Sequence, residues 1–113
     1  MMPMNWNTLN SINQLDQIDT ESKTVPIMIL KHSTRCNISA MALSRMERKW
    51  QGDEKIRPYY LDLIAHRDVS GEIARRYGVE HESPQVLIIK NGQCVYTASH
   101  SSITYEDITG FAA

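Results

Sequence analysis

Cys36 and Ser39 are the pair of residues best suited to chemistry in this sequence, where they form a Cys-x-x-Ser motif. A cysteine thiolate is the nucleophile that attacks disulfides. A serine three residues later can donate a hydrogen bond to that thiolate, but it cannot form a disulfide with it. Such a site can hold a mixed disulfide with an external thiol and cannot resolve it locally.

Cys36 lies where a helix is predicted to begin. The polar segment 31–35 separates an apolar run at 25–30 from apolar residues that recur at helical spacing from 36 to 50. A helix N-terminus carries partial positive charge and unpaired N–H groups, and Lys31 and Arg35 add cations, so the thiolate is favoured. The alternative is an ordinary buried cysteine in a helix. The polar residues before Cys36 favour a position near the surface.

The remaining patterns predict one α/β domain over residues 1–113. Helices are expected over 8–19, 36–50, 68–77 and 104–111, and strands over 25–30, 56–63, 86–89 and 94–98, with 3–7 as a candidate for a further short strand. Asn91-Gly92 is typical of a two-residue hairpin turn. The first two strands, joined by a helix, should be parallel, and the last two antiparallel. This order predicts a thioredoxin-like fold, with a central mixed four-stranded sheet flanked by helices.

A second polar segment, residues 81–84, leads into the first strand of the hairpin. In a thioredoxin-like order, a cis-proline at Pro84 would face the nucleophilic cysteine and leave the backbone of Ser83 free to pair with a bound peptide or thiol. A trans-proline that starts a strand is the alternative. A regular hairpin register places His100 opposite Ser83, where it could be a proton donor, a carboxylate partner or simply a surface histidine.

Cys94 is not expected to react with Cys36. It lies near the hairpin turn, about five residues along the strand from Pro84, or roughly 17 Å. Bridged cysteines have Cα atoms within about 7 Å of each other. The histidines are scattered, so no metal-ligand spacing is present and no bound metal is expected.

Composition restricts the class of protein further. The chain has 113 residues and a formal net charge of −1, which fits one domain and argues against a nucleic-acid-binding face. No apolar run approaches the roughly 20 residues of a membrane span. The N-terminal residues show no secretory-signal pattern. With two cysteines only, a reducing compartment is expected, and therefore a cytoplasmic location.

Four segments of the sequence resemble one family. Residues 31–39 are similar to the active-site stretch of the YtxJ-type monothiol bacilliredoxins, and residues 61–70, 81–85 and 98–100 match the same family. One departure is Asn37, which stands where the family usually has proline. The resemblance implies that Cys36 removes bacillithiol from S-bacillithiolated client proteins, with bacillithiol as the thiol co-substrate and no bound cofactor.

The resemblance also implies roles for individual residues. Cys36 and Ser39 would be catalytic, and the substrate would contact Lys31, Thr34, Arg35, Asn37, Ser83, Pro84 and His100. Lys31 and Arg35 would bind the malate carboxylates of bacillithiol. Two other functions stay open. Monothiol glutaredoxins use the same motif to carry an iron–sulfur cluster, and a thioredoxin scaffold can also serve as a redox-inert binding module.

Overall fold

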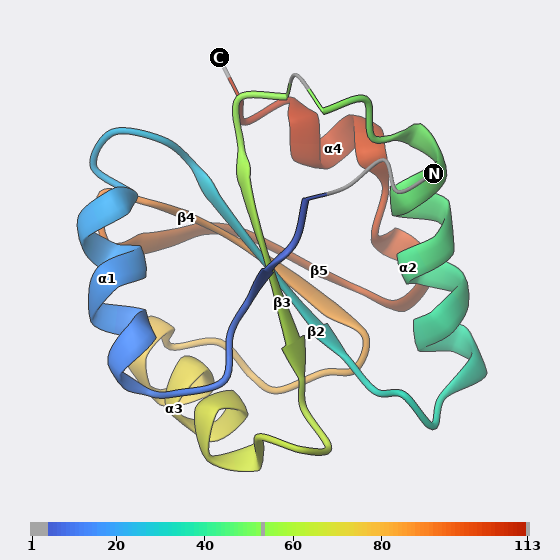
Figure 1. The fold of residues 1–113 in the computed structure, drawn as a ribbon, viewed down its shortest axis with the longest axis horizontal. Coiled ribbons are helices and arrows are strands. Elements are labelled where there is room, and N and C mark those ends of the chain that lie inside the picture. Colours follow the sequence, from blue (N-terminus) through green and yellow to red (C-terminus); the bar gives the residue numbers. More distant parts are fainter. Residues whose placement is uncertain (1–4, 53, 113) are drawn as a thin grey trace.

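The computed structural model describes residues 5–52 and 54–112. They form one mixed sheet with the strand order β1-β3-β2-β4-β5. Figure 1 shows α1 and α3 on one side of the sheet and α2 and α4 on the other. The strands are β1 Asn7–Thr8, β2 Ile27–His32, β3 Arg57–Asp62, β4 Gln85–Lys90 and β5 Gln93–Ser99, and the helices are α1 Asn13–Glu21, α2 Asn37–Lys49, α3 Arg67–Tyr77 and α4 Tyr105–Thr109.

The sheet has five strands instead of the expected four. Asn7 and Thr8 pair in parallel with Tyr59 and Tyr60 of β3. The candidate strand at 3–7 is therefore realised at its last residue, and residues 3 and 4 lie outside the described part of the chain. This pairing also explains why α1 begins later than expected. The Leu9 N–H donates to the Tyr60 carbonyl oxygen at 2.8 Å, so the chain is still extended where a helix was predicted.

β2 is the central strand, and all six of its residues are buried. Its side chains alternate between two cores, as strand geometry requires. Ile27 and Ile29 pack in the core that includes the buried residues of α1 and α3, whereas Met28 and Leu30 pack in the core that includes those of α2 and α4. Lys31 and His32, the next two residues, therefore point to opposite faces of the sheet.

Backbone conformation and hydrogen bonds define the ends of several helices. Gly78 ends α3 in the left-handed conformation, with φ of 66°, as a helix-terminating glycine does. The Thr104 hydroxyl accepts the Asp107 N–H at 3.2 Å and caps α4. At the start of α3, however, His66 occupies the N-cap without a side-chain cap bond, and Asp68 lies inside the first turn.

The β4–β5 hairpin turns at Asn91 and Gly92, whose φ angles of 53° and 74° agree with the predicted turn. Ile89 lies opposite Cys94, in the register of a regular two-residue hairpin, but the register shifts between Ile88 and Ile89. Beyond this bulge, Gln85 pairs with Ser99. The expected pairing of Ser83 with His100 is therefore wrong by one residue, because a regular register cannot include the bulge.

Candidate thiol site

Two loops meet at one edge of the sheet and form the candidate site. The loop at 33–36 follows β2, and the loop at 78–84 precedes β4. Lys31 pairs with Gln85, so the two loops leave the sheet at neighbouring positions. The peptide bond between Ser83 and Pro84 is cis, as the sequence predicted.

Cys36 is the N-cap residue of α2, in an extended backbone conformation. Its N–H donates to the Ser33 carbonyl oxygen at 3.2 Å, and its carbonyl accepts the Ala40 N–H at 3.0 Å. Its side chain makes no cap hydrogen bond, and the residue is partly exposed. The thiol therefore lies at the positive end of the helix dipole.

Ser39 is 1% exposed and is held by groups other than Cys36. Its Oγ accepts the Ser33 N–H at 3.0 Å and lies 2.7 Å from Nδ1 of His32. Burial lowers the pKa of His32, so its imidazole is neutral at neutral pH and Nδ1 can accept the serine proton. The expected hydrogen bond from Ser39 to Cys36 is not formed, because the hydroxyl is already used on both sides.

Lys31 is fully buried on the opposite face of the sheet. Its Nζ lies 3.4 Å from the Ser70 carbonyl oxygen and 3.3 Å from Nδ1 of His81. Burial lowers the pKa of its ammonium to about 8, and no carboxylate of the described residues forms an ion pair with it. The expected role of Lys31 as a surface cation for an anionic substrate is therefore corrected: strand alternation turns it into the core on the α3 side.

The other predicted substrate residues lie in the two loops, in the first turn of α2 or just after β5. Thr34, Arg35 and Asn37 are exposed. The Oγ of Ser83 is the one enclosed side-chain oxygen or nitrogen, over residues 5–52 and 54–112, that has no hydrogen-bond partner. His100 is half-exposed, with its Nε2 4.0 Å from the Glu82 carboxylate, and its backbone N–H donates to the Pro84 carbonyl oxygen at 3.1 Å.

Gln85 is a residue of the site that the sequence analysis did not single out. Its side chain is buried; Nε2 donates to the Glu80 carbonyl oxygen at 2.9 Å, and Oε1 accepts the Glu82 N–H at 3.4 Å. These bonds fix the loop that carries Ser83 and Pro84. The sequence signal for Gln85 is a polar residue at the start of an otherwise apolar strand. Burying such a side chain costs free energy unless it is hydrogen-bonded.

Cys94 lies apart from the site, packed against the core on the α1 and α3 side. Its Sγ donates to the Tyr96 carbonyl oxygen at 3.3 Å, and burial raises the pKa of its thiol. Cys94 pairs with Ile89, and Ile89 pairs with Ile27, the first residue of β2. Cys36 lies beyond the other end of β2, after its last residue. Six strand residues span roughly 17 Å. Both thiols are free, in agreement with the expected separation.

The described residues contain no group of three or more histidine, cysteine or acidic side chains placed to hold a metal ion. Within the same part of the chain, none of the helices has the length and apolar character needed to cross a membrane.

The fold and the site together define a thioredoxin-fold protein with a single cysteine at the start of α2. Comparison with known proteins agrees. A solved thioredoxin-fold protein proposed to be an oxidoreductase is 34% identical, with a TM-score of 0.80 over 91% of this chain and 89% of its own. Thioredoxins from Malassezia sympodialis and Trypanosoma brucei brucei share the fold at 17% and 11% identity, both with TM-scores of 0.74, over 97% of this chain and 90% and 88% of theirs.

The family is also established. The model of the monothiol bacilliredoxin family, BrxC, matches residues 7–108, and the chain belongs to this family. Its general activity is therefore that of a thiol–disulfide oxidoreductase. The resemblance read from residues 31–39 and the three other segments is confirmed at this level.

Proposed function

We propose that this protein removes bacillithiol from S-bacillithiolated client proteins through Cys36. The observation that carries the proposal is the position of Cys36: a partly exposed thiol at the N-cap of α2, without a side-chain cap bond, in a chain of the monothiol bacilliredoxin family. The thiolate is the form of a cysteine that attacks a disulfide.

The reaction has two exchanges. The Cys36 thiolate attacks the bacillithiol sulfur of the client mixed disulfide, the client thiolate leaves and takes a proton, and bacillithiol stays bonded to Cys36. The thiolate of a second bacillithiol then attacks that sulfur, which frees Cys36 and forms bacillithiol disulfide. Ser39 supplies no sulfur, and Cys94 belongs to the other face of the sheet, so the external thiol must complete the cycle.

The residues around Cys36 have distinct parts in this scheme. Arg35 is an exposed cation beside the nucleophile, and it is the partner we assign to the malate carboxylates of bacillithiol. Ser83, Pro84 and His100 line the neighbouring loop and strand end, where the backbone of Ser83 can pair with the substrate. We assign the reaction to the cytoplasm, because a chain with only two cysteines fits a reducing compartment.

Intact mass spectrometry tests the proposal. The reduced protein is mixed with a client protein that carries bacillithiol on one cysteine, and the masses of both proteins are followed. We expect the client to lose bacillithiol while this chain gains it on Cys36, and free bacillithiol to reverse the gain. Cys36→Ser should abolish transfer, and the matched variant Cys94→Ser should retain it. Transfer that survives Cys36→Ser would refute the assignment.

A further inference from the structure

The solvent-facing side of α2 carries an unusual row of residues next to the nucleophile. Ile38 and Met41 are 55% and 61% exposed, and they are two of the four exposed large hydrophobic residues in the described part of the chain. Arg45 and Arg48 follow at helical spacing, so the four residues lie along one side of the helix. This row, Ile38, Met41, Arg45 and Arg48, is called the α2 stripe below.

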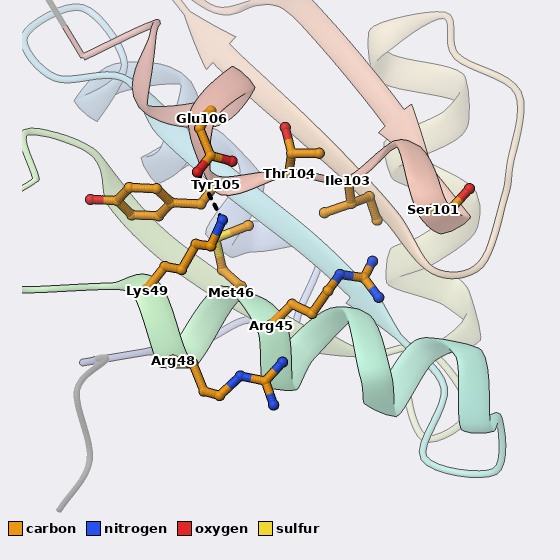
Figure 2. Close-up of a pocket in the computed structure, with 9 residues that line it drawn as sticks. All are labelled: Arg45, Met46, Arg48, Lys49, Ser101, Ile103, Thr104, Tyr105 and Glu106. Atoms are coloured by element: carbon orange, nitrogen blue, oxygen red, sulfur yellow. Dashed lines mark hydrogen bonds and ion pairs between the residues drawn. The ribbon is translucent and has the colours of Figure 1, made fainter.

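The arginines of the α2 stripe have no acidic partner among the described residues. Neither Arg45 nor Arg48 forms an ion pair with a described residue, whereas the neighbouring Lys49 lies 2.8 Å from Glu106. Figure 2 shows these four side chains. Glu47, the single acidic residue of α2, accepts a hydrogen bond from the Trp6 indole instead. In a chain with a net charge of −1, the stripe is therefore a local concentration of uncompensated positive charge.

The surface around the arginines contains two hollows. One hollow of about 190 Å³ separates α2 from the segment that contains Ser101 and Thr104, and Arg45 and Arg48 both line it. A second, of about 180 Å³, is lined by Met41, Ser44 and the same two arginines. Side chains of a partner can thus reach the guanidinium groups from a surface that is not flat.

We propose that the α2 stripe docks client proteins that carry an apolar residue close to the reacting cysteine and acidic residues farther along the same extended segment. The inference rests on the proposed function and adds a preference among clients. At about 1.5 Å per helical residue, Arg45 and Arg48 lie roughly 14 and 18 Å from Cys36 along the helix axis. An extended client segment covers that length in about four to six residues.

Charge and composition favour this occupant over others. A second copy of the chain, paired stripe to stripe about a twofold axis, would offer the arginines no acidic partner, because the stripe itself contains none. Nucleic acid requires a broad basic face, whereas this stripe has two arginines and two apolar residues. Acidic side chains at the far end and apolar contact near the thiol complement it directly.

Peptide binding tests the inference without disulfide chemistry. Two fluorescein-labelled peptides are compared. Each carries a serine in place of the reacting cysteine and a leucine beside that serine. They differ only at the fifth and sixth positions after the serine, which are Glu-Glu in one peptide and Lys-Lys in the other. Fluorescence anisotropy measures their affinity for the wild type and for Arg45→Glu/Arg48→Glu. Lys23→Glu/Lys90→Glu is the matched control, because it makes the same change in charge at the hairpin end of the sheet, where the Asn91 N–H meets the Ser22 carbonyl oxygen.

We expect the wild type to bind the Glu peptide about tenfold more tightly than the Lys peptide, and the arginine variant to lose or reverse that preference, while the control keeps it. Ile38→Ser/Met41→Ser should weaken the binding of both peptides. Equal binding of the two peptides by the wild type, or equal loss in the control, would overturn the inference. So would a dimer of the wild type that the arginine variant abolishes in sedimentation. Bacillithiol transfer plays no part in this test, so a failure of the proposed function is seen separately.

Discussion

Lys31 and His32 are neighbours on β2, and both are buried, yet they belong to different parts of the molecule. His32 faces α2, where its Nδ1 lies 2.7 Å from the hydroxyl of Ser39. Lys31 faces α3, where its Nζ has a carbonyl oxygen and the Nδ1 of His81 for partners. The first contact is part of the thiol site, and the second is a buried cation with neutral partners.

The comparison shows that polarity and nearness in sequence do not place a residue at the site. The α2 face holds Cys36, Ser39 and His32 together, while Lys31 and Cys94 pack against the other core or its edge. The difference arises from the alternation of side chains along β2, which sends consecutive residues to opposite faces. Changes on the two faces should therefore have separate consequences.

The largest contrast is expected between the two thiols. In single-cysteine variants, Cys36 should react with iodoacetamide at least about tenfold faster than Cys94 near neutral pH, because burial raises the pKa of the Cys94 thiol and restricts access to it. Alkylation is followed by mass spectrometry in Cys94→Ser and Cys36→Ser. Equal rates would mean that the two faces do not differ in thiol reactivity.

Lys31→Met should raise the free energy of unfolding at neutral pH by about 1–3 kcal/mol, since an apolar side chain of similar length replaces a buried cation that has no counter-ion. The pKa of Lys31 is lowered to about 8 in the folded chain and is near 10.4 in an unfolded one. The unfolded state therefore binds more protons between these values, and the stability contributed by Lys31 rises with pH across them.

Urea unfolding at several pH values measures both effects. The wild type should gain stability between about pH 8 and pH 10.5 relative to Lys31→Met, which should lack that component. A loss of stability in Lys31→Met at neutral pH would show that the neutral partners of the ammonium stabilise it by more than its burial costs. The buried cation on the α3 face would then not destabilise the fold.

Ser39→Ala should lower the free energy of unfolding by about 1–2 kcal/mol, because it leaves the buried Ser33 N–H without its acceptor and His32 without its hydroxyl partner. The matched change on the other face is Ser70→Ala. Among the described residues, the Ser70 hydroxyl has one hydrogen-bond contact, which is longer, 3.3 Å to Nδ1 of His81, so a smaller loss is expected. Chemical denaturation of the two variants compares them, and equal losses would remove the distinction between the faces.

The smallest effect is expected at the helix starts. Asn37→Pro should stabilise the protein by about 0.4–1 kcal/mol, because Asn37 is the first residue of α2 and Cys36 before it, with ψ of 120°, already has the conformation that precedes proline. Arg67→Pro, at the first residue of α3, should not stabilise it, since His66 has ψ of 62°. Thermal unfolding compares the stability of the two variants. An increase in stability in both would show that the ψ angle of the preceding residue does not decide the effect.

Local patterns were sufficient for much of the fold and for the position of Cys36 at the start of a helix. The Cys-x-x-Ser motif at a helix start, the Asn91-Gly92 turn and the helix end at Tyr77 were all predicted from the sequence. Each depends on a few consecutive residues whose backbone preferences or hydrogen bonds are satisfied nearby, and such preferences hold in almost any surrounding.

Other features required the assembled chain. The bulge after Ile88 shifts the pairing of His100 by one position. β1 pairs with the edge of β3, which is distant in sequence. The Ser39 hydroxyl bonds to His32 on the preceding strand instead of to Cys36. Lys31 was buried because the strand that carries it lies at the centre of the sheet. These outcomes depend on which distant segments pack against which face, and no short stretch of sequence contains that information.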